Sequence, residues 1–264
     1  MASSVLQRSQ TTEMTEFPAY SLIDAPEAIS DLMDTLYNLP GEVPALYVDL
    51  EGENLSREGT ISILQIYISP RKHAYIIDIR ALGHNAFLTP GHKYNQTLQS
   101  VLECSEVTKV FFDVRNDSDA LFAHFGIKLD GVQDLQLMEF ASRESRKSFL
   151  CGLAKCIDRD SPLSPEERQK WGNIKDTGRR LFDPPSGGSY AVFNKRPLPR
   201  DILLYCIQDV QYLPQLWLVY NQKLTSDSRL HVIRESQARI KLSQSADFNG
   251  QGRHMVLPPA GWAS

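Results

Sequence analysis

The stretch Val48-Asp49-Leu50-Glu51-Gly52 places two acids, one residue apart, at the end of an apolar run. Residues 45–50 have the composition of a β-strand, and residues i and i+2 of a strand point to the same face of the sheet. Asp49 and Glu51 are therefore expected to project side by side. Adjacent carboxylates repel each other, and a divalent cation with oxygen ligands is the usual relief. An isolated acid-x-acid pair is more often just the exposed end of a strand.

Strands and helices alternate downstream of this stretch. Two further β-rich runs cover residues 61–68 and 74–79, and the connection 52–59 is short enough to predict antiparallel pairing. A helical stretch near 94–104 follows, and after it come a strand at 109–113, a helix at 117–125 and a strand at 132–137. This alternation predicts an α/β fold with a sheet of mixed strand directions.

Two later acids complete a possible metal site. Asp117 opens a helix directly after a strand, where α/β folds place ligands, although Asp113 and Asp119 are rivals and helix capping explains any one of them. Tyr205 and Asp209 are four residues apart in a predicted helix over 202–213, so both side chains lie on one helical face. A buried tyrosine beside an exposed acid would give the same spacing without any chemistry.

The basic residues are concentrated in one segment. The chain has a formal net charge of −4, which does not by itself indicate a nucleic-acid binder. Between residues 168 and 200, however, eight basic and two acidic residues give +6, so the remainder sums to −10. This segment is expected to bind the phosphate groups of a nucleic-acid backbone, and Arg179, Arg180 and Arg196 are its candidate substrate-binding residues. A solvated loop is the simpler explanation of such a cluster.

The ordered set of motifs resembles the DEDD exonuclease superfamily, in the branch with Tyr in its third motif, to which ribonuclease D belongs. The resemblance covers roughly residues 20–224 and is closest to the Egalitarian-like exonuclease domains. The resemblance extends to residues around the acids, and in the first motif these are Gly59 and Ser62-Ile63-Leu64-Gln65-Ile66. In the second motif they are Lys109-Val110-Phe111, Arg115-Asn116-Asp117-Ser118 and Phe125-Gly126-Ile127. In the third motif they are Arg196-Pro197-Leu198, Tyr205, Asp209-Val210 and Leu213. Phe112 departs from the pattern where many relatives have His, and Phe193-Asn194-Lys195 stands where ribonuclease D-like chains often carry Trp.

This resemblance implies a ribonuclease H-like mixed sheet flanked by helices and a 3'-5' exonuclease activity. Asp49, Glu51, Asp117 and Asp209 match the metal ligands, and Tyr205 matches the residue that orients the attacking water. The implied cofactors are two divalent metal ions, Mg²⁺ or Mn²⁺. The implied partner is the 3' end of a nucleic acid, with RNA slightly favoured over DNA, and the products are nucleoside 5'-monophosphates.

Outside this region we expect a disordered N-terminal segment at 1–19, and a C-terminal helix followed by an irregular tail at 225–264. No apolar run is long enough to span a bilayer, so no membrane partner is expected, and the expected setting is intracellular, nuclear or cytoplasmic. The main alternative is a catalytically silent nucleic-acid-binding or scaffold module of the same fold, but such modules lose acids that are all present here. A general phosphohydrolase with the same metals is a second alternative.

Overall fold

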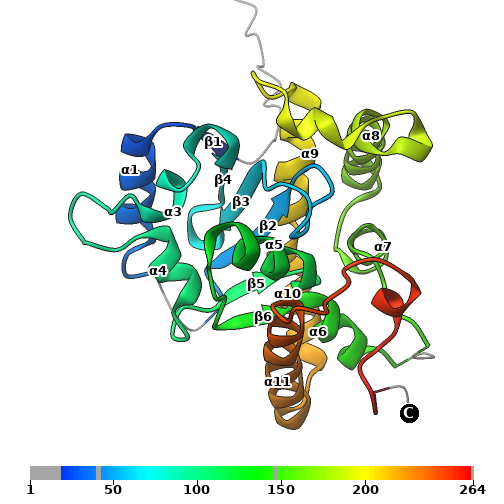
Figure 1. Ribbon diagram of the computed structural model, residues 1–264. Helices are drawn as coiled ribbons and strands as arrows, with labels where there is room; N and C mark the ends of the chain where they lie inside the picture. Colours follow the sequence, from blue (N-terminus) through cyan, green and yellow to red (C-terminus); the bar gives the residue numbers. More distant parts are fainter. Residues whose placement is uncertain (1–18, 40–42, 145–147, 263–264) are drawn as a thin grey trace, which may run out of the picture.

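The computed structural model describes residues 19–39, 43–144 and 148–262, which form a mixed sheet with helices on both faces (Figure 1). The sheet has six strands in the order β1-β4-β3-β2-β5-β6. Their bounds are Ala19–Ile23 for β1, Leu46–Glu51 for β2, Ile63–Ile68 for β3, His73–Asp78 for β4, Lys109–Phe111 for β5 and Val132–Asp134 for β6. The pairs β2–β3 and β3–β4 are antiparallel, whereas β1–β4, β2–β5 and β5–β6 are parallel. The predicted mixed sheet and antiparallel connection are confirmed.

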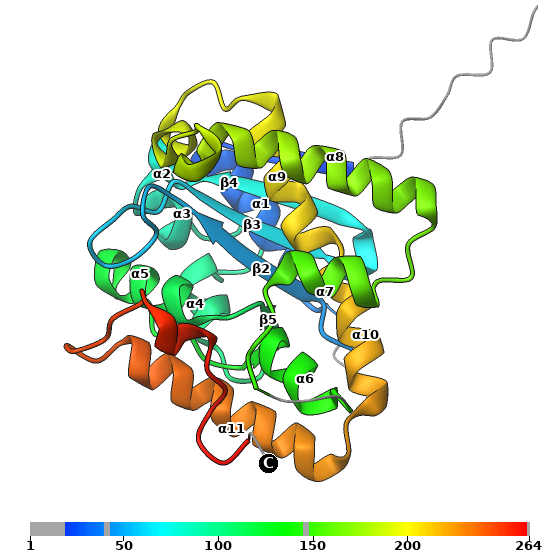
Figure 2. The ribbon, with the colours of Figure 1, turned by 90° about the vertical axis from the view of Figure 1, so that its right-hand side faces the viewer.

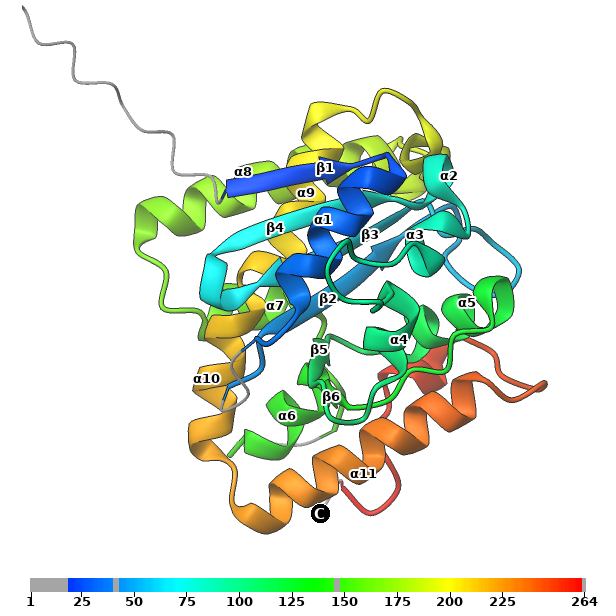
Figure 3. The same ribbon diagram turned by 90° about the vertical axis from the view of Figure 1, so that its left-hand side faces the viewer.

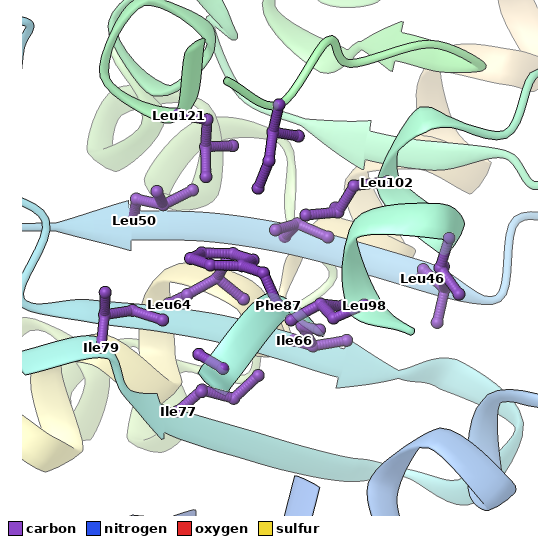
Figure 4. Packing of buried hydrophobic residues seen from close by; sticks show 14 of the residues in the cluster. Leu46, Leu50, Leu64, Ile66, Ile77, Ile79, Phe87, Leu98, Leu102 and Leu121 are labelled. Carbon is purple, nitrogen blue, oxygen red and sulfur yellow. The ribbon is translucent and has the colours of Figure 1, made fainter. Parts of the chain in front are cut away.

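One face of the sheet is covered by the helices α1 to α5 (Figure 3). Their bounds are Pro26–Leu36, Ile79–Leu82, Asn85–Leu88, Leu98–Glu103 and Arg115–Phe125. Leucine, isoleucine and phenylalanine side chains of these helices pack on the strands to form a first hydrophobic core, with Phe87 near its centre (Figure 4). This core contains no metal-ligand candidate, so its role is to hold β2 and β5 in place.

The opposite face is covered by α6 to α10, which Figure 2 shows across the sheet from α1. Their bounds are Leu135–Ser142, Leu153–Asp160, Pro165–Phe182, Arg200–Gln211 and Leu213–Lys223. Helix α9 lies directly on β2, β3 and β4, and α8 packs on α9 from outside. A last helix, α11 (Ser226–Ser243), runs beside β6 and contacts α5 and α6.

The pleat of β2 decides which core its side chains enter. Leu46, Val48 and Leu50 belong to the first core, whereas Tyr47 belongs to the core under α9. Side chains alternate along a strand, so Asp49 and Glu51 share the face of Tyr47 and point toward α9. The predicted common direction of the two acids therefore brings them to the helix that carries Tyr205 and Asp209.

Several elements differ from the predicted ones. Residues 132–137 form a strand only as far as Asp134, because the Asp134 carboxylate accepts a hydrogen bond from the Gln136 amide and starts α6 there. The strand β1 and the helix α1 were not predicted. Neither was α8, which begins with a capping box between Ser164 and Glu167 and carries the first part of the basic segment. All but one residue of the predicted disordered segment 1–19 lies outside the described residues, and Ala19 begins β1.

The C-terminal residues belong to the folded body. Helix α11 starts at Ser226, because Thr225 caps it by accepting a hydrogen bond from the Ser228 amide. The chain then turns back over α5 and α11 in a path that includes a short 3-10 helix at Arg253–Val256 (Figure 2). None of the helices in the described ranges has the length and apolar character needed to cross a bilayer.

Candidate active site

Three of the predicted metal ligands meet between β2 and α9. Asp49 and Glu51 come from β2 and Asp209 comes from α9, and one carboxylate oxygen of each lies within 4.8 Å of the others. Asp209 is only 3% exposed, and the two strand acids are half-buried. Three acids this close, with hard oxygen donors and one open side, form a suitable cage for a divalent cation.

The fourth predicted ligand, Asp117, sits in the first turn of α5, just outside this cluster. Burial first, and then the Asp49 carboxylate, raise the pKa of Asp117, and Asp117 in turn contributes to the raised pKa of Glu51, so the acids share one electrostatic environment. The rival acids are otherwise engaged. Asp113 pairs with Arg115 at 2.6 Å and Asp119 pairs with Arg57 at 2.6 Å.

Within the described residues no basic side chain forms an ion pair with Asp117, although it is only 5% exposed. A buried carboxylate without a cationic partner destabilises the folded state. Asp113 and Asp119, in contrast, each pair with an arginine. This difference favours Asp117 as the metal ligand of the second motif, as the resemblance implied.

The acids are strained electrostatically without a cation. Burial first, and then the nearby Asp209 charge, raise the pKa of Asp49 to about 8. Burial and Asp49 together hold the pKa of Glu51 well above its usual range. Lys175 opposes these shifts, but one ammonium group cannot offset four carboxylates. The donor set and its unbalanced charge fit a site for divalent ions.

Tyr205 lies one helical turn before Asp209 on α9 and is only 8% exposed. Burial, followed by the Asp209 charge, raises its pKa well above the usual value, so the phenol remains a hydrogen-bond donor at neutral pH. Its ring packs edge-on against Phe182 with centroids 4.9 Å apart. Gly178 of α8 lies against the same ring, and a Cβ built at Gly178 would come within 2.6 Å of it.

Lys175 of α8 is a site residue that sequence reasoning missed. Its ammonium group pairs with the Asp209 carboxylate and lies 3.9 Å from the centroid of the Tyr205 ring. In the sequence it was counted only as one charge of the basic segment. The signal that could have found it was the capping box at Ser164, which marks α8 and places Lys175, Gly178 and Phe182 on successive turns of one helix.

The three predicted substrate-binding arginines lie in different environments. Arg196 uses all five N–H donors within the protein: two reach the Asp78 carboxylate, and three reach the carbonyl oxygens of Phe193, Lys195 and Ser62. A phosphate contact by Arg196 would require the loss of one of these bonds, and its substrate role stays a prediction. Arg179 and Arg180 are exposed at the end of α8, and Arg179 makes one bond, of 3.3 Å, to Asp183.

The fold and the carboxylate cluster together define a ribonuclease H-like nuclease domain. The profile of a family described as 3'-5' exonuclease matches residues 20–225. The chain therefore belongs to the 3'-5' exonuclease family, as the sequence motifs predicted.

Known proteins share the fold and part of the sequence. The piRNA biogenesis protein EXD1 of Mus musculus is 30% identical over 193 residues, which cover 69% of this chain and 30% of that relative. The chain thus spans about 30% of the length of this relative. The Trypanosoma brucei RNase D structure in complex with RNA U12 is similar with a TM-score of 0.71 and 18% identity, over 93% of this chain and 78% of that one. Brucella melitensis NrnC with bound Mg²⁺ is similar with a TM-score of 0.54 and 20% identity, over 88% of this chain and 98% of that one.

Proposed function

We propose that this chain is an active, metal-dependent 3'-5' exonuclease that releases nucleoside 5'-monophosphates from the 3' end of nucleic acid, with RNA favoured over DNA. The observation that carries the proposal is the convergence of Asp49, Glu51 and Asp209 into one oxygen cluster, with Asp117 beside it. A silent module of this fold would gain nothing from keeping four acids whose mutual repulsion destabilises the metal-free protein.

Two divalent ions, Mg²⁺ or Mn²⁺, would supply an activated water and stabilise the departing 3' oxygen. Asp49, Glu51 and Asp209 would hold one ion, and Asp49 with Asp117 would hold the other, because Asp49 is the charged neighbour with the largest effect on Asp117. The two ions carry four positive charges, which would neutralise the four carboxylates.

The remaining residues of the site position the reactants. Tyr205 would donate its hydroxyl hydrogen bond to the water and orient it for in-line attack, since its raised pKa makes it a poor base. The Lys175 ammonium group pairs with the Asp209 carboxylate and would hold it in place, and it also lies beside the Tyr205 ring. Helix α8 therefore supports the two functional side chains of α9.

Relatives favour an RNA substrate. The Trypanosoma brucei RNase D structure is a complex with RNA, and the mouse relative is described as a piRNA biogenesis protein. We therefore propose an RNA 3' end as the preferred substrate and an intracellular, nuclear or cytoplasmic setting. Residues 20–224 would form the exonuclease domain, with the helix and tail of 225–264 packed against it.

The direct test is hydrolysis of 5'-labelled single- and double-stranded RNA and DNA with Mg²⁺ or Mn²⁺. We expect a ladder that shortens one nucleotide at a time, on RNA faster than on DNA, and no reaction in EDTA or on a 3'-blocked end. Cleavage of the blocked substrate would indicate a general phosphohydrolase instead. Binding of RNA without any shortening, with both metals, would establish the silent module.

The exposed arginines at the end of α8 are expected to contribute affinity for any sequence. Reversing both charges, Arg179→Glu with Arg180→Glu, should weaken RNA binding about equally for all sequences, because phosphate contacts carry no sequence information. Each lost contact should reduce the slope of log K against log salt by roughly one unit. The rate at saturating substrate should change little, because the carboxylates are untouched.

Fluorescence anisotropy over a salt series measures both effects. The matched control reverses two basic residues on α11, Arg229→Glu with Arg234→Glu, which leaves the total charge the same as in the test variant. Equal affinities and salt slopes in the test variant and the wild type would show that Arg179 and Arg180 only solvate the surface.

A further inference from the structure

A cavity of about 810 Å³ opens beside the carboxylate cluster, and Glu51 forms part of its wall. Three parts of the chain line it: the connection between β2 and β3, the first turns of α5, and the C-terminal segment at residues 248–251. Tyr190 adds a further aromatic side chain. The C-terminal segment lies beyond residue 225, where the family match ends.

Arg57 fixes the end of α11, just ahead of the C-terminal segment. The Arg57 guanidinium donates to Asp119 Oδ1 at 2.6 Å and to the carbonyl oxygens of Ser243, Ser245 and Ala246 at 2.8, 2.8 and 3.1 Å. Its backbone amide also donates to Asp119 Oδ2 at 2.8 Å. Four of the five N–H donors are thus used within the protein, and the side chain acts as a clamp on the end of α11.

Two further contacts fix the path of the segment. Arg115 donates to the Met255 carbonyl at 2.7 Å, and the Leu150 amide donates to the Val256 carbonyl at 2.9 Å. Gly250 passes so close to Asn116 that a Cβ built there would lie 2.1 Å from the Asn116 Oδ1 atom. Several independent contacts therefore hold this wall of the cavity. The wall lies next to Asn116, which directly precedes Asp117.

The lining has the chemistry of a nucleobase pocket, not of a phosphate pocket. Phe248 and Tyr190 are half-buried and offer flat apolar surfaces, while Asn54, Asn116 and Gln251 offer amide groups. The Asn116 Oδ1 atom is buried against Gly250 and has no hydrogen-bond partner among the described residues. Phosphate recognition needs free cations, whereas the arginine of this lining is already engaged.

We propose that this cavity receives the terminal nucleobase of the substrate and that Phe248, on the C-terminal segment, contacts its face. The proposal rests on the proposed exonuclease function, because it takes the carboxylate cluster as the place where the terminal phosphodiester lies. The segment at 248–251 is then part of the substrate-binding surface. Phe248 favours substrates whose 3'-terminal nucleotide carries a base.

The experiment compares two single-stranded RNAs that are identical except that one lacks the 3'-terminal base. Base–aromatic contact of this kind should give the wild type a preference of about tenfold in kcat/KM for the complete RNA. Phe248→Ala should lose the preference, mainly through a higher KM, while Phe248→Tyr should keep it. The control is Trp262→Ala, which removes a C-terminal aromatic that stacks on His231 and lies outside the cavity.

The outcomes separate the pocket from the activity. Equal kcat/KM for the two RNAs in the wild type, or an unchanged preference in Phe248→Ala, would overturn the pocket while leaving the exonuclease intact. If the wild type hydrolyses neither RNA, the proposed function fails. Fluorescence anisotropy in EDTA then tests the pocket separately, by comparing the binding of the same two RNAs. A binding preference that is lost in Phe248→Ala would support it, and equal binding would overturn it.

Discussion

Asp49→Asn should abolish exonuclease turnover while leaving the fold intact. The substitution keeps the size of the side chain but removes a charged oxygen from an acid that interacts with both Asp209 and Asp117. Loss of a residue that merely supports a metal ligand costs about 10- to 100-fold, so loss of a shared ligand should exceed 100-fold. Single-turnover hydrolysis with Mg²⁺ and with Mn²⁺ measures the effect.

The matched control is Asp176→Asn, which removes an exposed carboxylate from α8. It should leave the rate unchanged. An Asp49→Asn variant that retains even a tenth of the wild-type rate would remove Asp49 from the ligand set.

The same variant should be more stable than the wild type when no metal is present. In the folded protein burial raises the pKa of Asp49 to about 8, whereas the unfolded chain titrates near the ordinary value of about 3.9. The folded state therefore prefers the protonated acid, so the contribution of Asp49 to stability is complete below about pH 4 and is lost as the pH rises toward 8.

Asparagine cannot ionise, so the melting temperature of Asp49→Asn relative to the wild type should rise across this pH range in EDTA. Each kcal/mol should appear as about 2–4 °C for a protein of this size. Added Mg²⁺ or Mn²⁺ should raise the melting temperature of the wild type more than that of the variant. A constant difference from pH 4 to pH 8 would show that Asp49 is not strained in the folded protein.

The arrangement of the acids follows from local rules, which is why the sequence predicted it. The period of two along β2 places Asp49 and Glu51 on one face, and the spacing of four on α9 places Tyr205 and Asp209 on another. Each rule acts over a few residues. The two faces meet only because α9 packs on β2. This packing was expected from the family resemblance and not from the residue spacing.

The contacts that could not be predicted join residues far apart in the chain. Lys175 and Asp209 are 34 residues apart, and Arg57 and Ser243 are 186 apart. The sequence does not indicate which residues a lysine in a basic segment or an arginine in a loop will contact. The segment at residues 248–251 was likewise predicted only as part of an irregular tail, and its position beside the cavity is a property of the packed fold.

Gly178→Ala should lower the rate of hydrolysis although alanine is the better helix former. A glycine inside a helix normally costs about 0.5–1 kcal/mol relative to alanine. At Gly178, however, a Cβ would lie 2.6 Å from Cδ2 and 2.8 Å from Cβ of Tyr205, so the ring or the helix must move. Overpacking of this kind costs about 1–3 kcal/mol, which outweighs the gain in helix propensity.

The displaced ring is the one that should orient the water, and a misplacement of about 1 Å can cost about 100-fold in rate. The effect should fall on kcat, with metal affinity in calorimetric titration nearly unchanged, because the atoms nearest to the added Cβ all belong to Tyr205 and not to a carboxylate. Tyr205→Phe combined with Gly178→Ala should be little slower than Tyr205→Phe alone, since both changes act on the same hydroxyl.

Helix α8 supplies its own control at Gly172, where a Cβ would meet nothing within 4 Å. Gly172→Ala should raise the free energy of unfolding by about 0.5–1 kcal/mol and leave the rate unchanged, because it gains helix propensity without a clash. Urea denaturation and single-turnover kinetics on the two variants therefore test the contact itself. If Gly178→Ala is as stable and as fast as Gly172→Ala, then α8 does not hold Tyr205, and the support assigned to this helix is wrong.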